Sequence, residues 1–564
     1  MSVRKNAGAR VLLVGLDGAD PGLVEAWARA GELPVLAELV ATGRCGSPRA
    51  FPLTSTLPAW TSVLTGASPG RHGVLDFTVR HGYGVRFVGG ATRALPTLVR
   101  HLDEQGLTAA LLGFPGTFPP EQLVRSVAIS GWDSPVSSAL GEGFVEPPWL
   151  HRRLVASVGA RALALDAAGL DEHRPDRTGM AELGRILAES LRRRATLAYF
   201  LLGRLRFDLL AVYFGETDTA AHHLWPGHDP GSPRRPKGFC PPARDPLLEV
   251  YRAADEVIGE LVDRARPEAV IVVSDHGSGG ASDTVLHLNR WLARAGLQRR
   301  GSSVCAGALA RAREVAPALL PQPLREPLFR QLGRALPNLV ESWTRLGGID
   351  FRRTVAFSEE IPYAPSVWLN VAGREPRGVV DPGRREATAS MVARQIESEL
   401  RDPWTGAAVV RRAWLREEVL AGPAVARAPD ILLELELDRG YSYALLPSNR
   451  GCDAEGPFVK LADAELLGRK GRALSGSHRP DAFLALSGRS VGAGRLESVA
   501  LEDVAPTVCA MLGIPGPPGC EGRALVPGEG EPDASRDLQP SATAGSPANA
   551  AILRDRLRRL GYVD

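Results

Sequence analysis

The sequence predicts an α/β protein in which helices cover both faces of a mostly parallel central sheet. Short apolar runs with the length and branching of buried parallel strands recur along the chain. Helical stretches such as residues 181–205 separate these runs. Strands that alternate with helices over most of a chain are typical of a parallel sheet between two helical layers. The 564 residues suffice for one large domain with inserts or for two domains.

Five apolar runs are expected to be strands of this sheet. In chain order they are VLLVGL (11–16), LTAALLG (107–113), DLLAVYF (208–214), AVIVVS (269–274) and DAFLALS (481–487). Two inserts interrupt the alternation. Residues 301–346 have a helical, amphipathic pattern, and residues 354–440 contain strand-like segments such as SVWLNVAG and DILLELEL. We expect these inserts to form a cap over one end of the sheet.

These patterns divide the chain into four predicted parts. Residues 1–290 and 460–525 are expected to form the α/β core, and residues 291–459 the inserted helical and mixed cap region. Residues 526–550 are rich in Pro, Ser, Gly and Ala, which predicts a flexible linker. Residues 551–564 predict a short basic amphipathic helix, which either docks on the domain or binds a partner.

Composition and charge argue against several classes of protein. The chain has 67 Lys and Arg residues against 64 Asp and Glu, so no excess of positive charge indicates nucleic-acid binding. Its six cysteines include no CxxC pair, which suits a reducing compartment. No signal-peptide pattern opens the chain, and the most apolar later stretch, 195–214, is interrupted by Arg204, Arg206 and Asp208. We expect a cytoplasmic protein without a transmembrane segment, and we leave its oligomeric state open.

Carboxylates and histidines lie where the predicted strands meet their loops. Ligands of open α/β sheets bind beyond the carboxyl ends of the strands, so these side chains are expected to lie close together. A single aspartate there is usually a helix cap, but three aspartates and three of only eleven histidines favour a functional site. The six residues are Asp17, Asp218, His222, Asp275, His276 and His478.

Carboxylates and imidazoles together form the ligand set of Zn²⁺, Mn²⁺ or Fe, whereas Mg²⁺ and Ca²⁺ prefer oxygen alone. Six ligands are enough for two ions, and two ions roughly 4 Å apart can clamp the attacking and leaving oxygens of a displacement at phosphorus. The spacing of Asp218 and His222 places both side chains on one face of a helical turn. The neighbouring His223 is expected to serve packing or to support the ligands.

The stretch FPLTSTLPAWTSVLTG (51–66) predicts a helix that begins near Thr56, with Pro58 in its first turn. By itself such a hydroxyl is a plain helix cap. However, a helix N-terminus also presents free N–H groups to a phosphate. A threonine bound there to a metal ion would become an alkoxide nucleophile near neutral pH. Thr54 and Ser55 are the less favoured alternatives.

Six motifs, in this order, resemble those of the alkaline phosphatase superfamily, specifically its type I phosphodiesterase / nucleotide pyrophosphatase branch. They span residues 11 to about 525 and are LVGLDGAD, TSTLPAWTSVLTGASPGRHGV, ETDTAAHHLW, VVSDHG, GSHRPDAFLALSG and DVAPTVCAMLGIP. The resemblance implies an alkaline-phosphatase-like core and a small-molecule phosphoester substrate. It also implies in-line attack by a threonine, a covalent phosphothreonine, and its hydrolysis from the opposite side by metal-bound hydroxide.

The resemblance also implies two divalent metal ions, with zinc as the usual metal of this branch and Mn²⁺ or Fe as alternatives. One ion would be held by Asp17, Thr56, Asp275 and His276, with Thr56 as the nucleophile, and the other by Asp218, His222 and His478.

One departure affects the substrate. Ala59 stands where many nucleotide pyrophosphatases have an asparagine that contacts a phosphoryl oxygen, so nucleotide substrates cannot be assumed. The helix N–H groups, Trp60 or a cap residue would have to compensate. Four further candidates for lining the pocket are weaker, and packing is favoured for the first two: Trp132, Asp133, Asn370 and Arg374.

The leading hypothesis is a phosphodiesterase or nucleotide-pyrophosphatase-like hydrolase. A phosphomonoesterase of the same superfamily is the first alternative, and it would need an additional cation for the dianionic phosphoryl group. A sulfatase would need a CxPxR-type motif, which LTSTLPAWTS lacks, and a relative of the metal-independent phosphoglycerate mutases would use serine. A catalytically silent metal-binding scaffold is the alternative from a different class.

Overall fold

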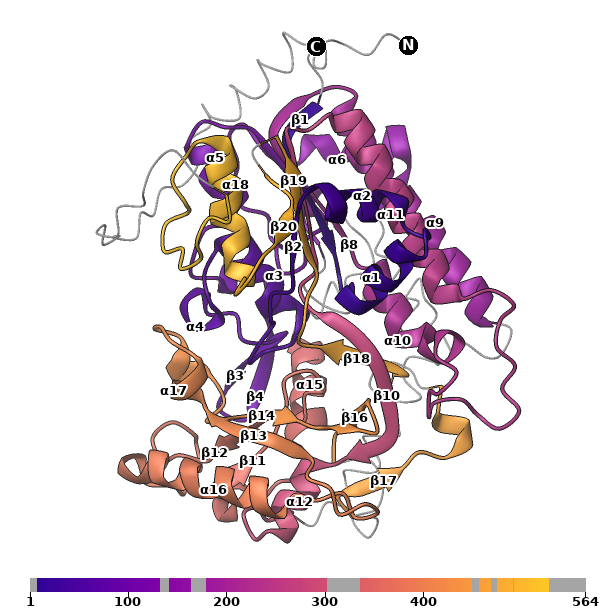
Figure 1. The fold of residues 1–564 in the computed structure, drawn as a ribbon. Coiled ribbons are helices and arrows are strands. Elements are labelled where there is room, and N and C mark those ends of the chain that lie inside the picture. The colour runs from indigo at the N-terminus through magenta and orange to yellow at the C-terminus, as the bar shows by residue number, and fades with distance from the viewer. Residues whose placement is uncertain are drawn as a thin grey trace.

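A central sheet of nine described strands organises the larger part of the molecule (Figure 1). The computed structural model describes residues 8–131, 141–163, 179–301, 335–448, 456–467, 474–489 and 491–526. The strand order is β20-β2-β19-β9-β1-β8-β5-β6-β7, and the run from β9 to β6 is parallel throughout. The α/β fold class with a mostly parallel sheet is therefore confirmed. The strands are β1 (Gly8–Leu16), β2 (Arg44–Gly46), β5 (Ala109–Leu112), β6 (Val127–Ile129), β7 (Val145–Glu146), β8 (Arg206–Phe214), β9 (Ala269–Val273), β19 (Leu484–Gly488) and β20 (Gly494–Arg495).

All five predicted apolar runs contain a strand of this sheet, but the last one runs in the opposite direction. β19 pairs antiparallel with β9, with Leu484 opposite Val273 and Gly488 opposite Ala269. The beginning of β19 therefore lies at the edge where the parallel strands end. This geometry explains how His478, which precedes its strand, reaches the same edge as residues that follow theirs.

Helices cover both faces of the sheet, because alternate residues of a strand point to opposite sides (Figure 1). In β1, Leu12 and Val14 enter one apolar core and Val11 and Leu13 enter the other. Within the described residues, no helix combines the length and the apolar character that a membrane crossing requires. The first core includes α1 (Pro21–Arg29), α2 (Pro34–Thr42), α9 (Gly179–Leu202) and α11 (Pro246–Ala265), and the second includes α3 (Thr56–Thr65), α5 (Leu98–Glu104) and α18 (Val504–Leu512).

A smaller four-stranded sheet, of order β11-β12-β14-β13, lies beyond one end of the main sheet, and we call this region the cap (Figure 1). SVWLNVAG and DILLELEL supply β12 and β14. α15 (Ala335–Leu346) accounts for the described end of the predicted helical insert; residues 302–334 and the predicted C-terminal helix lie outside the described residues. The predicted boundaries between core, cap and linker stay a prediction. The cap elements are β11 (Ala356–Phe357), β12 (Ser366–Leu369), α16 (Arg385–Glu399), β13 (Val410–Leu415) and β14 (Ile431–Leu435).

One long strand joins the two parts. β10 (Gly277–Leu286) starts directly after His276 and runs into the cap (Figure 1). Its first half pairs antiparallel with β18 (Gly476–Arg479), which carries His478. Its second half pairs with β16 (Tyr441–Leu445) and β17 (Phe458–Lys460). The same strand thus begins at the candidate ligands and ends inside the cap.

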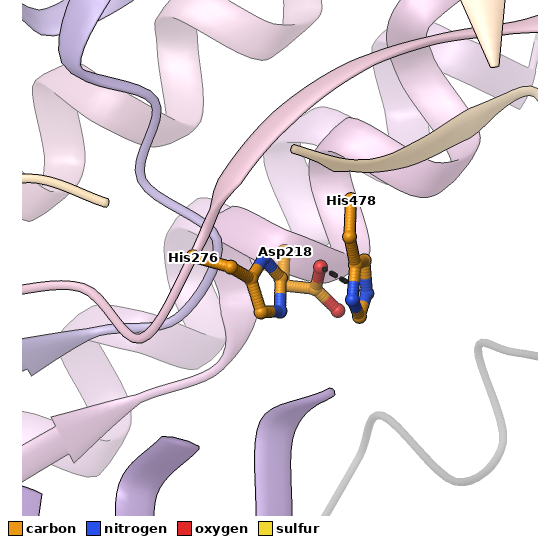
Figure 2. Close-up of side chains that lie close together, drawn as sticks. All are labelled: Asp218, His276 and His478. Carbon is orange, nitrogen blue, oxygen red and sulfur yellow. Dashed lines mark ion pairs between the residues drawn. The ribbon is translucent and has the colours of Figure 1, made fainter. Parts of the chain in front are cut away.

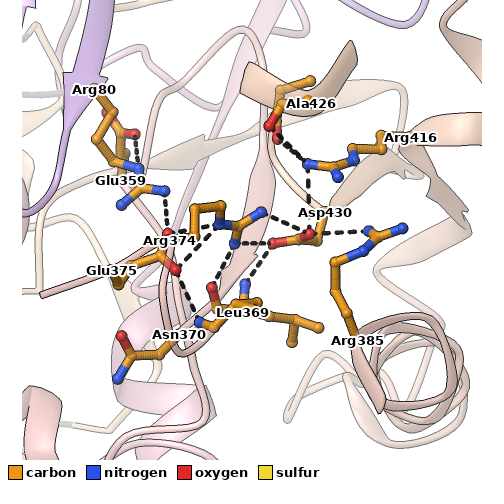
Figure 3. A network of polar contacts seen from close by, with 12 residues as sticks. Arg80, Glu359, Leu369, Asn370, Arg374, Glu375, Arg385, Arg416, Ala426 and Asp430 are labelled. Carbon is orange, nitrogen blue, oxygen red and sulfur yellow. Dashed lines mark hydrogen bonds and ion pairs between the residues drawn. The ribbon is translucent and has the colours of Figure 1, made fainter. Parts of the chain in front are cut away.

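Buried ion pairs fasten the cap to the core (Figure 3). The hairpin of β3 (Thr78–His81) and β4 (Gly84–Phe87) carries Arg80, which donates to Glu375 at 2.6 Å. Glu375 also pairs with Arg374 at 2.8 Å, and Arg374 pairs with Asp430 at 2.6 Å. The Glu375 and Asp430 side chains are fully buried. Arg374 is therefore part of a buried ion-pair network inside the cap.

Asn370 is likewise structural. Its side chain is fully buried, and its Nδ2 donates to the carbonyls of Phe351 and Thr354 at 2.7 and 2.9 Å. Its Oδ1 accepts a 2.8 Å hydrogen bond from Tyr83 of the β3–β4 hairpin.

We expect Asp430→Ala to lower the free energy of unfolding by about 3–5 kcal/mol, because it removes a buried carboxylate that several arginines share. Arg374 and Arg385 each lose one carboxylate partner in this variant, while Arg374 keeps Glu375 and Arg385 keeps Glu417. The matched control is Glu436→Ala, which breaks an exposed pair with Arg411 and should cost about 0–1 kcal/mol. Urea denaturation of both variants measures the difference. Equal losses would show that the Asp430 network is not what holds the cap.

Candidate metal centre

β1 delivers Asp17 to the edge of the sheet. Its Oδ2 accepts hydrogen bonds from the Tyr213 hydroxyl at 2.5 Å and from the Trp60 indole at 3.2 Å. Its Oδ1 is buried and has no hydrogen-bond partner within the described residues. The next residue, Gly18, has φ +64°, and a Cβ there would lie 2.9 Å from Asp218 Oδ1. Only glycine allows the chain to turn here with Asp17 and Asp218 side by side.

Asp275 and His276 follow β9, and both are fully buried. Asp275 Oδ1 accepts from the Gly18 amide at 3.1 Å, while its Oδ2 lies 3.3 Å from His276 Nε2. His276 Nδ1 lies 2.9 Å from the carbonyl of Gly277, which fixes Nδ1 as the donor and leaves Nε2 with its lone pair. His276 Nε2 is also 3.5 Å from Asp17 Oδ1.

Three buried atoms thus converge without a hydrogen bond among the described residues: Asp17 Oδ1, Asp275 Oδ2 and His276 Nε2. Buried polar atoms are nearly always satisfied, so an unsatisfied group of this kind requires a partner. When both carboxyl groups are ionised, all three atoms are acceptors. A cation is the partner that satisfies all three at once.

The second group is built on α10 (Glu216–His228), where Asp218 and His222 lie one turn apart with Oδ1 and Nε2 at 3.3 Å (Figure 2 shows Asp218). His478 of β18 places its Nε2 at 3.5 Å from Asp218 Oδ1 and 3.1 Å from His222 Nε2. The predicted contact of Asp218 with His222 on one helical face is found.

The other ring nitrogens of this group point at carbonyls. His222 Nδ1 lies 3.0 Å from Gly476 O, and His478 Nδ1 lies 2.8 Å from Thr54 O. When both Nδ1 atoms donate, two Nε2 lone pairs face each other, an arrangement that a shared cation stabilises. Separations of this size are those of two ligand atoms on one ion with bonds of about 2.0–2.1 Å. The residues present therefore fit a metal ion.

The two ligand groups lie next to each other. Asp17, Asp275 and His276 offer ligand atoms within 4.8 Å of one another, and so do Asp218, His276 and His478. The rings of His276 and His478 are stacked with centroids 3.6 Å apart. All six residues that the sequence singled out at the strand ends are therefore brought together at one edge of the sheet.

Asp17, Asp275 and His276 form the first ligand group. Burial raises the pKa values of its two acids and lowers the pKa of its histidine. Burial and the nearby charge of Asp218 raise the pKa of Asp17 to about 7. Burial and the charge of Asp17 raise the pKa of Asp275 well above its ordinary range. Burial lowers the pKa of His276 to about 3, so its imidazole is neutral at pH 7. In the described part of the chain, neither Asp17 nor Asp275 pairs with a lysine or arginine. Positive charge has to come from elsewhere.

α3 begins at Thr56, with Ser55 as the N-cap. Ser55 makes no side-chain cap bond, and its buried Oγ has no partner among the described residues. The third helical residue, Pro58, lacks the N–H that a cap side chain could bind. The Thr54 hydroxyl donates to Ala50 O at 2.9 Å, whereas that of Thr56 makes no hydrogen bond in the described structure. Of the three hydroxyls, that of Thr54 is therefore already bound to a backbone carbonyl.

Contacts on both sides of Thr56 tie the start of α3 to the ligand groups. Before it, the carbonyl of Thr54 binds His478 Nδ1, and after it, Trp60 donates to Asp17. The Trp60 indole N–H is therefore already bound to Asp17. It does not take the place of the asparagine that many nucleotide pyrophosphatases have at the position of Ala59. The Ala59 side chain is itself buried in the core.

Sequence reasoning missed Trp60 and Tyr213 as hydrogen-bond donors to Asp17. One signal was present in the sequence, namely the glycine Gly15 within VLLVGLDG. A Cβ at this position would lie 2.7 Å from the Trp60 indole. This glycine makes room for the donor. Trp132 and Asp133 lie outside the described residues.

The model of the family Type I phosphodiesterase / nucleotide pyrophosphatase matches residues 11–456. No curated protein sequence matches. Solved structures that resemble the chain include the phosphonoacetate hydrolase from Sinorhizobium meliloti 1021. Its complex with phosphonoformate is 13% identical, with a TM-score of 0.46, and its complex with phosphonoacetate is 14% identical, with a TM-score of 0.45. Both alignments cover 89% of this chain and 96% of the other.

The match covers most of the chain, and its range contains five of the six candidate ligands as well as Thr56. His478 lies just beyond its end, on the strand that pairs with β10. The chain therefore belongs to the type I phosphodiesterase / nucleotide pyrophosphatase family of the alkaline phosphatase superfamily and is a phosphoester hydrolase.

Proposed function

We propose that the protein is a two-metal phosphodiesterase of the nucleotide pyrophosphatase type that uses Thr56 as its nucleophile. The observation that carries this proposal is the convergence of Asp17 Oδ1, Asp275 Oδ2 and His276 Nε2, three buried acceptors without a hydrogen bond among the described residues. The second ligand group lies next to them. The start of α3 contacts both groups, because Thr54 O binds His478 and Trp60 donates to Asp17.

We propose two sets of metal ligands. Zinc suits this mixture of carboxylates and imidazoles, and Mn²⁺ or Fe would accept the same ligands. When bound, the ions would supply the positive charge that polarises the phosphoryl group and lowers the pKa of the nucleophile. One set is Asp17, Thr56, Asp275 and His276, and the other is Asp218, His222 and His478.

The chain's own residues would carry the remaining steps. Thr56 Oγ1 would attack phosphorus and form a phosphothreonine, while the leaving alcohol departs on the opposite side. The first N–H groups of α3 would bind the phosphoryl oxygens. Trp60 and Tyr213 would hold Asp17 in place through Oδ2, which leaves Oδ1 directed at the first site. Water would then cleave the phosphothreonine and restore the hydroxyl.

The charged residues around the candidate ligands favour a diester substrate over a monoester. A dianionic phosphoryl group calls for an additional cation. Of the candidate ligands, Asp17, Asp275 and His276 have no lysine or arginine within ion-pair distance in the described residues. The arginines of the cap network are engaged with Glu375, Asp430 and Glu359.

We expect Thr56→Ala to lower the turnover of bis-p-nitrophenyl phosphate by about 10³-fold or more, because the attacking oxygen is lost. Because Asp17, Asp275 and His276 remain as ligands of the first ion, the zinc content at saturating metal and the thermal stability should change little. Thr54→Ala is the matched control: its hydroxyl is used by Ala50, and its carbonyl, which contacts His478, remains. Turnover of p-nitrophenyl phosphate by the same samples tests the preference for diesters. If Thr56→Ala keeps wild-type turnover, Thr56 is not the nucleophile.

Metal affinity should fall as the pH decreases below about 7. In the metal-free protein the pKa of Asp17 is raised to about 7, so below that value a metal ion has to displace a proton. Each displaced proton lowers the apparent affinity about tenfold per pH unit. Zinc titrations by calorimetry, in buffers of different ionisation enthalpy, measure both the affinity and the protons released. An affinity that stays constant between about pH 5.5 and 7 would contradict the displacement of a proton from Asp17 by the metal ion.

A further inference from the structure

A tyrosine of the cap lies flat against one of the candidate ligands. The rings of Tyr363 and His478 are stacked, with centroids 3.6 Å apart and planes 9° apart. His276 is stacked on His478 at the same distance, with planes 20° apart. Two rings so close and so nearly parallel to His478 have to occupy its opposite faces. Tyr363, His478 and His276 therefore form a continuous stack that links the cap to both ligand groups.

The loop that presents Tyr363 is firmly anchored. Glu360 is buried and has φ +54°, a left-handed conformation that is unfavourable for a non-glycine residue. Such a conformation persists only where surrounding contacts impose it. The Glu360 carboxylate accepts hydrogen bonds from the amides of Asn289 at 2.9 Å and Ser448 at 2.5 Å.

Neighbouring residues of this loop restrict it further. Glu359 pairs with Arg345 at 3.1 Å. Pro362 and Pro365 flank Tyr363 in the sequence IPYAPS and fix two backbone dihedral angles. The position of the Tyr363 ring is thus set by the fold of the cap.

We propose that Tyr363 is a positioning residue that holds the His478 imidazole in the orientation that metal binding requires. This inference rests on the proposed role of His478 as a ligand. The bond from His478 Nδ1 to Thr54 O selects the tautomer, but a single hydrogen bond leaves the ring free to tilt about it. Rings on both faces prevent that tilt. They keep Nε2 at 3.1 Å from His222 Nε2 and 3.5 Å from Asp218 Oδ1.

Replacement of Tyr363 should weaken metal binding, and it should lower turnover only through that weaker binding. Groups that orient a metal-ligating histidine typically contribute about 10–100-fold to affinity. Because His478 belongs to one ligand group only, we expect the loss to affect one of the two ions. Excess metal should then restore the turnover of a weakened variant.

The test compares Tyr363→Ala, Tyr363→Leu and Tyr363→Phe by zinc titration against a chromophoric chelator and by the visible spectrum of the Co²⁺-loaded protein. We expect Tyr363→Ala and Tyr363→Leu to bind one ion about 10–100-fold more weakly, and Tyr363→Phe to match wild type because it keeps the flat ring. Tyr83→Ala is the matched control, since Tyr83 stacks on Phe351 at the same 3.6 Å spacing away from the ligands. It should bind both ions normally.

Wild-type affinity and an unchanged Co²⁺ spectrum in Tyr363→Ala and Tyr363→Leu would overturn the inference. His478→Ala separates this result from a failure of the proposed function. If His478→Ala loses one ion, the ligand role of His478 holds and the tyrosine variants test the positioning role alone. If it keeps both ions with wild-type affinity, His478 is not a ligand, and the proposed centre and the inference fail together.

Discussion

The close approach of three carboxylates at one edge of the sheet, two of them buried, is the constraint on which the rest of the centre depends. Asp17, Asp218 and Asp275 lie together, and the raised pKa values of Asp17 and Asp275 show that their ionisation is unfavourable in the metal-free protein. The folded state then binds these protons more tightly than the unfolded state does. Their contribution to stability is therefore lost as the pH rises toward about 7 for Asp17. His276, with its pKa lowered to about 3, acts in the opposite direction, because the unfolded chain binds its proton more tightly. Divalent ions would remove the conflict between the carboxylates and keep the imidazole neutral.

Much of this arrangement could be predicted because it is local in the sequence. β1, β8 and β9 are apolar runs that are each followed within four residues by an aspartate, and parallel strands carry such residues to a common edge. The spacing of Asp218 and His222 is a property of one helix. These features need no knowledge of how distant segments pack.

The unpredicted features depend on long-range packing. That Trp60 and Tyr213 donate to Asp17 depends on how α3 packs against β1 and β8, which no local pattern encodes. The antiparallel direction of β19 was not evident from its apolar composition. Tyr363 was missed for the same reason, since it reaches His478 from a cap loop whose sequence has no ligand pattern. His276 borders both groups, and that proximity depends on the relative placement of β9, β10 and β18.

β10 has a consequence for attempts to exchange the cap of this enzyme for another. The strand is continuous from the residue after His276 to the interior of the cap, and it also pairs with the strand that carries His478. Successive residues of a strand face opposite sides, so the insertion or deletion of one residue would reverse the facing of everything beyond it. A chimaera would therefore have to join the two proteins within the far half of β10 and preserve its residue count. A foreign cap grafted without that match would be misplaced relative to the histidines even if every ligand were retained.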